Sequence, residues 1–452
     1  MVHQIYPPEK VVSNVCRLLK ELKINQLLRA ANIKKSRGIS VQQVFELIFL
    51  FALYGKNQYE FLESKRAQGL PRKDVYYNFL NNPHYAWRRF LLLLASKVTD
   101  TFDYLTSDKR VRAFVIDDSP VARNRSKQAE LLARVFDHSK QCYIRGFNML
   151  TLGWTDGYSF VPVDFVMLSS AKETNRYNEA SASIDKRSHG FKRRLEAVMQ
   201  KPDVVLKLIK NALNIGITAD YVLMDTWFTN EPMLKELRSI GLHVIGMTKN
   251  GNQRYLYNGQ LMKLDELRKC LHSENKHEII GSLSCETKNG IPVKMVFIRN
   301  RNKKSEWLAI TSTDLSLDEK EIVRIYGMRW QIEVFFKASK SLLKLGTEYQ
   351  GRSYDMLIAH TTIVFSRYIL LEWERRHNQD PRSLGGLFFL LCEEIHDLDY
   401  ETALKQLMSF CMLLLDHVSK EFAKTVSSQL MHWIASLPSY IQGLFSNFCA
   451  ES

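Results

Sequence analysis

The sequence lacks the features that mark secreted, disulfide-stabilised and membrane-spanning proteins. Its seven cysteines form no CxxC pair, and an odd number does not suit a complete disulfide framework, so we expect reduced thiols. No apolar run approaches the ~20 residues of a membrane span. The N-terminal MVHQIYPPEK has no charged segment followed by an apolar one, as a signal peptide would have. We therefore expect a cytoplasmic globular protein that has no membrane partner.

Repeats and low-complexity segments are also absent, whereas positive charge is abundant. The 452 residues carry a formal net charge of +15, which is spread along the chain and not gathered in a tail. A hydrophobic content of 45% is typical of a globular protein with a large core and two or three domains. Such an excess of Lys and Arg favours a polyanion as partner, with nucleic acid ahead of an acidic membrane.

The hydrophobic pattern divides the chain into helical ends and a strand-rich middle. Helical periodicity fills residues 8 to about 108, which either dock on DNA or form an ordinary bundle. From Arg112 the order reads β-β-β-α-β-α-β, which predicts an α/β core with a mixed sheet. We expect five segments: an N-terminal helical, DNA-binding domain (1–108), the first part of the core (109–251), a β-rich insertion (252–312), the final part of the core with a catalytic helix (313–350) and a C-terminal helical region that could dimerise (351–452).

One predicted helix carries an unusual set of polar side chains. In YGMRWQIEVFFKASK, residues 326–340, a rotation of about 100° per residue puts five polar groups within a sector roughly 80° wide. Apolar residues such as Ile332 and Phe335 fill the adjacent sector and would be buried. The polar face is either an ordinary solvated surface or a place where a carboxylate and phosphate-binding groups act together. Its members are Tyr326, Arg329, Glu333, Lys337 and Lys340.

Acidic residues follow two predicted strands upstream of that helix. RAFVID leads into Asp117 and Asp118, and YVLMD ends in Asp225. Converging carboxylates repel by about 4 kcal/mol per pair at ~4 Å and an effective dielectric constant near 20, so a cation must offset their charge. Mg²⁺ prefers carboxylate and phosphate oxygens, and two ions can activate the attacking oxygen and stabilise the leaving one. We therefore predict that one of Asp117 and Asp118, together with Asp225 and Glu333, binds two Mg²⁺ ions, for which Mn²⁺ can substitute, and that the reaction cleaves or transfers phosphodiesters.

Together these residues resemble a known family. The element order, with acids after the first and fourth strands, resembles a ribonuclease H-like core. Tyr326, Arg329, Glu333 and Lys340 match YxxRxxxExxxxxxK, the YREK signature of cut-and-paste DDE transposases of bacterial insertion sequences. The phrases VFDHS, GWTDG and LMDTWF also resemble that family, so the resemblance covers residues 114 to about 345.

The resemblance implies a catalytic triad of three acids. These are Asp225, Glu333 and either Asp117 or Asp118. The family pattern, in which an apolar strand leads to Asp, any residue and then Ser or Thr, favours Asp117. Asp118 would then be a supporting or capping residue.

Side chains outside the triad are candidates for DNA contact. Tyr326, Arg329, Lys337 and Lys340 would hold the phosphates of the strand being cut. Trp307 stands where the family has an aromatic residue that stacks on a flipped base, although a strand tryptophan can equally belong to the core. A basic cluster upstream could follow phosphates or be a solvated face. It includes Lys192, Arg193 and Arg194.

The resemblance implies a transposase that cleaves DNA at insertion-sequence ends and joins the freed 3′-hydroxyl to target DNA. Its partners would be double-stranded terminal inverted repeats and target DNA. It would form a hairpin intermediate and act in trans as a homodimer, in the bacterial cytoplasm at the nucleoid. Two alternatives need similar residues: a ribonuclease H-like nuclease or resolvase without strand transfer, and a catalytically inactive relative that binds DNA.

Overall fold

The computed structural model describes residues 14–63, 70–107, 110–271, 278–300, 303, 306–349, 351–415 and 419–436. The chain divides into two compact units. Leu19–Leu387 forms the larger unit, which contains the sheet and the candidate site. The other unit combines the described residues before Leu19 with those after Leu387.

The N-terminal part is helical, as its periodicity predicts. Ser40 accepts a hydrogen bond from the backbone N–H of Gln43, whose side chain bonds back to Ser40, and this capping box begins α3. The long helix α6 buries one apolar face, including Phe90 and Leu94. The helices here are α1 (Asn14–Glu21), α2 (Ile24–Ala30), α3 (Val41–Phe51), α4 (Gln58–Leu62), α5 (Lys73–Leu80) and α6 (Trp87–Tyr104).

Within the described residues, eleven strands form one mixed sheet in the order β2-β3-β1-β5-β6-β11-β10-β9-β7-β8, with β4 beside β3. Strands β1, β5 and β6 run parallel, and the other pairs are antiparallel. The predicted α/β architecture with a mixed sheet is therefore confirmed. The first six strands are β1 (Ala113–Ala122), β2 (Ala133–Asp137), β3 (Cys142–Thr155), β4 (Phe160–Leu168), β5 (Tyr221–Met224) and β6 (His243–Thr248).

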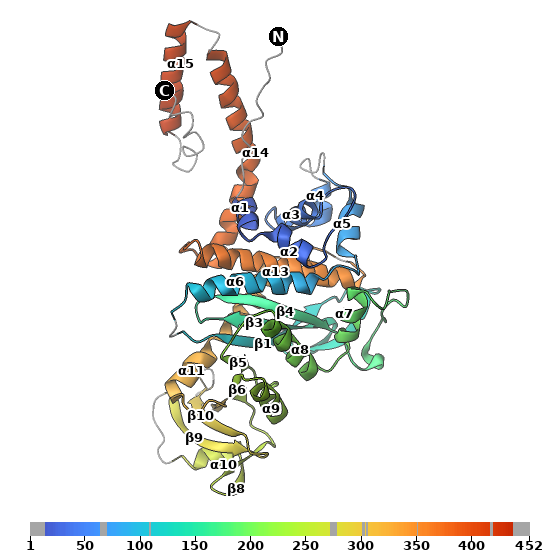
Figure 1. Cartoon of the computed structure of the whole chain (residues 1–452), viewed down its shortest axis with the longest axis vertical. Helices are drawn as coiled ribbons and strands as arrows, with labels where there is room; N and C mark the ends of the chain where they lie inside the picture. The colour runs from blue at the N-terminus through green and yellow to red at the C-terminus, as the bar shows by residue number, and fades with distance from the viewer. Residues whose placement is uncertain are drawn as a thin grey trace. The chain divides into compact units, whose positions relative to one another are not determined.

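Helices enclose the part of the sheet around β4. All nine residues of β4 are buried, because α6, α7, α8 and α13 pack against it and leave neither face exposed. Helices α6 and α13 lie side by side along the sheet (Figure 1). The helices that complete the core are α7 (His189–Ala197), α8 (Lys201–Asn214), α9 (Glu231–Ser239), α11 (Glu319–Gly327), α12 (Trp330–Ser341) and α13 (Tyr354–Arg376).

The predicted insertion contributes strands to the same sheet, joined to it where β11 pairs with β6. This part of the chain is coloured yellow in Figure 1. Its strands are β7 (Arg254–Tyr257), β8 (Gln260–Lys263), β9 (Ile279–Thr287), β10 (Pro292–Arg299) and β11 (Trp307–Ser312), and its short helix is α10 (Leu264–Lys269). The expected domain boundaries stay predictions.

Three local expectations are wrong. The strand that holds Asp117 does not end there, since β1 keeps pairing with β3 as far as Ala122. The apolar period of residues 192–213 predicts a single helix, but the structure has two, because Pro202 has no N–H to donate inside a helix and stands in the first turn of α8 instead. The single helix expected through residues 326–340 is divided between α11 and α12 at Met328 and Arg329.

The C-terminal part is helical as expected, although the separate helices that the pattern predicts at 384–396 and 403–420 are one helix as far as Leu415. The described helices after Leu384 are α14 (Leu384–Leu415) and α15 (Lys420–Ser436). Among the described residues, no helix combines the length and apolar character needed to span a membrane.

Candidate active site

Asp117 and Asp225 occupy equivalent positions on adjacent strands. Strands β1 and β5 are parallel, and their last registered pair is Ile116 with Met224. The next residue after each of these two is one of the acids, Asp117 within β1 and Asp225 directly after the end of β5. Residues at equivalent register positions point to the same face of a sheet. The two carboxylates lie close enough for each other's charge to matter, since the pKa of Asp117 responds to Asp225.

Arg329 links Asp117 to Glu333. One terminal nitrogen of the guanidinium lies 3.1 Å from Asp117 Oδ2, and the other bonds to Glu333 Oε1. Arg329 sits at the turn between α11 and α12 in right-handed helical conformation, so Tyr326, Arg329 and Glu333 keep nearly the spacing of a continuous helix. The structure thus brings Asp117, Asp225, Glu333 and Arg329 into one cluster.

Burial makes this cluster electrostatically unusual. It raises the pKa of the Asp117 carboxyl to about 7, although Arg329 acts in the opposite direction, and the neighbouring Asp225 and Asp118 raise it further. Burial also raises the pKa of the Tyr326 hydroxyl, which keeps it a hydrogen-bond donor at neutral pH. A strongly shifted carboxyl beside an arginine in a groove is typical of a functional site.

Asp118 has different partners from its neighbour. Its Oδ2 accepts a hydrogen bond from Asn148 Nδ2 at 2.8 Å and forms an ion pair with Lys201. Lys201 also lies over the ring of Trp227, 4.4 Å from its centre. Asp118 therefore already has a cation of its own and stands apart from the Arg329 pair. This geometry favours Asp117 as the member of the acidic cluster.

The donor set suits a divalent metal ion, because carboxylate oxygens are the ligands that Mg²⁺ and Mn²⁺ prefer. Asp117 and Asp225 supply two of them, and burial raises the pKa of the Asp117 carboxyl to about 7. In the described part of the chain, however, no three His, Cys, Asp or Glu side chains lie close enough to hold a metal ion. The guanidinium of Arg329 provides the positive charge between Asp117 and Glu333 instead.

A groove of about 830 Å³, here called the catalytic groove, runs beside these acids and is lined by Asp117, Glu333 and Lys340 among others. Lys340 Nζ donates to Ser119 Oγ at 2.7 Å and to the Pro120 carbonyl at 3.1 Å, so it lies along β1.

Lys337 does not share that position. It is exposed and lines a separate groove with Arg375 and Arg382. Of the predicted polar face, Glu333 and Lys340 therefore line the catalytic groove and Lys337 lines the other.

The upstream basic cluster is largely internal. Arg193 is buried, donates to the carbonyls of Tyr85 and Pro83 and pairs with Asp355 at 3.0 Å. Arg194 is buried as well and pairs with Glu130 and Asp355. The expectation that both arginines are free to bind DNA is wrong for this structure, because their donors hold α7 against its neighbours.

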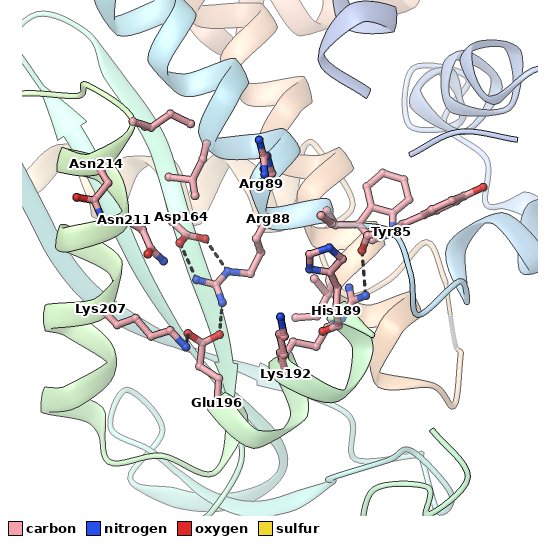
Figure 2. A pocket seen from close by; sticks show the side chains of 16 residues that line it. Tyr85, Arg88, Arg89, Asp164, His189, Lys192, Glu196, Lys207, Asn211 and Asn214 are labelled. Carbon is pink, nitrogen blue, oxygen red and sulfur yellow. Dashed lines mark hydrogen bonds and ion pairs between the residues drawn. The ribbon is translucent and has the colours of Figure 1, made fainter. Parts of the chain in front are cut away.

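Lys192, in contrast, is exposed and lines a pocket of about 500 Å³. Figure 2 shows it near His189, on the same side of the pocket and apart from the internal ion pairs. In that pocket Arg88 lies between Asp164 and Glu196 and bonds to both. Of the three predicted basic residues, Lys192 alone remains a candidate for DNA contact.

The tryptophans differ in how far they are exposed. Trp307 is half-buried in β11, packs edge-on against Phe297 at 5.5 Å and has Arg268 over its ring. Its stacking on a DNA base stays a prediction. Trp330, which the sequence analysis did not single out, is 62% exposed, and Trp227 is 50% exposed. The helical angle of Trp330, beside the polar sector and away from Ile332, is the signal that could have identified it.

Two family models match the chain. Residues 65–262 match the model described as DDE superfamily endonuclease, and residues 198–361 match the one described as transposase DDE domain. The first match includes Asp117 and Asp225, and the second includes Asp225 and Glu333. No curated protein matches the sequence.

Among solved structures, the Drosophila P element transposase strand transfer complex is similar at 10% sequence identity over 86% of this chain and 92% of that chain. Its TM-score of 0.21 does not establish a shared fold. The two family models overlap at residues 198–262 and together extend from residue 65 to residue 361. The chain therefore contains domains similar to DDE endonucleases and DDE transposases, which supports nuclease or transposase activity.

Proposed function

We propose that this protein is a DNA transposase of the YREK group of bacterial insertion sequences, with Asp117, Asp225 and Glu333 as its catalytic acids on a ribonuclease H-like core. The observation that carries the proposal is the alignment of Asp117 with Asp225 on parallel strands, with Glu333 joined to Asp117 through Arg329. The matches to DDE endonuclease and transposase domains support it.

The residues around the acids have separate roles in holding DNA. Arg329 exchanges its carboxylate partners for a phosphate of the strand being cut, for which its forked donors are suited. The hydroxyl of Tyr326 donates to the same backbone. Lys340, already placed along β1, supplies a further positive charge in the catalytic groove. Lys192, Lys337 and Trp307 are candidates for contacts farther from the cut.

Asp117, Asp225 and Glu333 would hold two Mg²⁺ ions, or Mn²⁺ in their place, once Arg329 binds phosphate. Bound there, such ions would activate the attacking oxygen and stabilise the leaving oxygen of a phosphodiester. Burial of Asp117 favours this, because a buried carboxylate needs a compensating positive charge.

The substrate of this site is double-stranded DNA, first an element end and then target DNA. The protein acts as a homodimer on that DNA in the bacterial cytoplasm, at the nucleoid. The positive charge of the chain is consistent with such a polyanionic partner.

Incubating the full-length protein with a labelled terminal repeat, a target plasmid and Mg²⁺ tests the proposal. We expect cleavage at the repeat and products in which the repeat is joined to the plasmid. Nicks without joined products would indicate a nuclease or resolvase. Binding with no cut would indicate an inactive DNA-binding relative, and either result would overturn the assignment as a transposase.

A further inference from the structure

A second groove continues the catalytic groove past the end of β1. We call it the basic groove; it has a volume of about 640 Å³ and is formed mainly by the loop 123–128 and by Arg352. Ala122 and Gly346 line both grooves, so the two adjoin along β1. A strand of DNA held at Asp117 can therefore continue into the basic groove without leaving the surface.

The basic groove is strongly positive. Arg123, Arg125, Lys127 and Arg352 line it, and none of its described lining residues is acidic. Glu130 follows the loop but already binds Arg194 and the backbone N–H of Tyr354. Four cations without an opposing carboxylate favour an anion that extends over the whole groove.

The loop backbone is held in place by the protein itself. Arg123 donates through its backbone N–H to the carbonyl of Arg145 at 2.7 Å and through its side chain to Tyr349 at 2.8 Å. Asn124 Oδ1 accepts from the Arg145 N–H at 3.0 Å, and Asn178 donates to the Lys127 carbonyl at 3.0 Å. The loop thus needs no ligand to fix it.

Three of the four cations that line the basic groove do not help to hold the loop. Arg125, Lys127 and Arg352 are exposed, and the described part of the chain offers their side chains no hydrogen bond or ion pair. A fixed backbone that presents unpaired cations is prepared to bind phosphates at a low cost in ordering.

The spacing fits a nucleic-acid strand. Ala122 lies five positions after Asp117, a distance of roughly 17 Å along a strand that rises about 3.3 Å per residue. A B-form DNA strand carries one phosphate per 3.4 Å along its axis, so the basic groove begins about five nucleotides from Asp117.

We propose that the basic groove binds the phosphate backbone of DNA next to the segment held in the catalytic groove. This inference rests on the proposed function, since it requires DNA at Asp117. It adds Arg125, Lys127 and Arg352 as positioning residues that touch neither the acids nor the phosphate being cut.

The test compares two triple variants of the full-length protein. One removes Arg125, Lys127 and Arg352 by substitution with Ala. The matched control removes three exposed cations of α8 and α9, Lys210, Lys235 and Arg238, for which the described residues likewise provide no side-chain partner. Both lose the same charge, so only the position of the charge differs.

The measurement is the affinity for a labelled linear duplex of about 30 base pairs at several KCl concentrations. The logarithm of the affinity falls as the logarithm of the salt concentration rises, and each lost phosphate contact makes this dependence less steep by about 0.9. We therefore expect the slope of the groove variant to be smaller in magnitude than that of the wild-type protein by roughly 2 to 3. The control should keep the wild-type slope. A groove variant with the wild-type slope would overturn the inference and leave the proposed function standing, whereas a wild-type protein that binds no duplex would contradict both.

Discussion

At the scale of single residues, Arg329 decides the state of the candidate site. In the absence of DNA, its guanidinium partly offsets the negative charges of the Asp117 and Glu333 carboxylates. A metal ion at these acids must therefore compete with a positive charge already in place. A phosphate that draws Arg329 away would remove this competition, which couples the binding of DNA to the binding of metal.

Substituting Arg329→Ala should raise the affinity of the DNA-free protein for Mn²⁺ about tenfold, a difference of about 1.4 kcal/mol. The reason is that the two carboxylates lose their internal counter-charge. Titration followed by electron paramagnetic resonance of free Mn²⁺ measures the change. Lys337→Ala, which removes a cation from the other groove, should leave the affinity unchanged. An unchanged or weaker affinity in Arg329→Ala would show that the arginine does not compete with metal.

The carboxyl of Asp117 should make stability depend on pH. Its pKa is about 7 in the folded protein and near the ordinary value of 3.8 in the unfolded chain. The folded state then binds the proton more tightly, so the free energy of unfolding falls as pH rises from about 4 to about 7. The loss is at most about 4 kcal/mol and is complete above that range.

Urea unfolding at about pH 5 and about pH 8 measures this contribution. Asp117→Asn cannot titrate, so it should lose less stability than the wild-type protein between the two conditions. Equal losses in the two proteins would contradict the raised pKa.

The sequence was informative about these residues but not about their pairing. It identified the acids and Arg329, because carboxylates after buried strands and a polar helix face are visible in the pattern. The sequence could not reveal that Arg193 and Arg194 are buried. A run of basic residues has the same sequence pattern whether or not the fold brings an acidic partner such as Asp355 beside it. Those partners lie far away along the chain.

At the scale of elements, α13 organises the core around the site. All its residues from Tyr354 to Trp373 are buried. Arg367 on this helix donates to the carbonyls of Phe49 and Leu343 and pairs with Glu348, which is fully buried. Those bonds connect α13 to two other parts of the chain, the end of α3 and the segment that follows α12. They therefore hold the C-terminal end of α12, the helix that carries Glu333.

Arg367→Ala should lower the free energy of unfolding by about 3 to 5 kcal/mol, because it leaves the buried carboxylate of Glu348 without its main partner. Chemical denaturation measures the loss. Arg382→Ala, which breaks a surface pair with Asp380, is the control and should cost less than about 1 kcal/mol. A loss as small as that of the control would show that α13 is held by apolar packing alone.

Elements with a clear apolar period were predictable, and short or interrupted ones were not. The Asp-Gly pair at 156 and 157 between two apolar runs predicts a hairpin, and β3 and β4 form one there, with Gly157 at a φ of +87° that glycine adopts readily. The strands β2 and β8 are not predictable from the sequence, because five or four residues with partly exposed side chains give too little alternation. The division between α11 and α12 occurs without Pro or a strong stop signal, so no local feature predicted it.

At the scale of the whole molecule, part of the excess positive charge lies in two adjoining grooves. The catalytic groove and the basic groove adjoin, and cations line both of them, Lys340 in the first and Arg125 and Lys127 in the second. The net charge of +15 predicted a polyanion but not where it would bind. Only the fold brings residues near 125 beside residues near 346.

The central claim is that Asp117 and Glu333 belong to one centre that cuts DNA. The most direct measurement is cleavage of a labelled element end by Asp117→Asn, Glu333→Gln and the neighbouring control Asp118→Asn, with DNA affinity measured in parallel. Asp117→Asn and Glu333→Gln should abolish cleavage and keep affinity within a few-fold, while Asp118→Asn still cuts. Cleavage that survives in Asp117→Asn or Glu333→Gln would contradict the account.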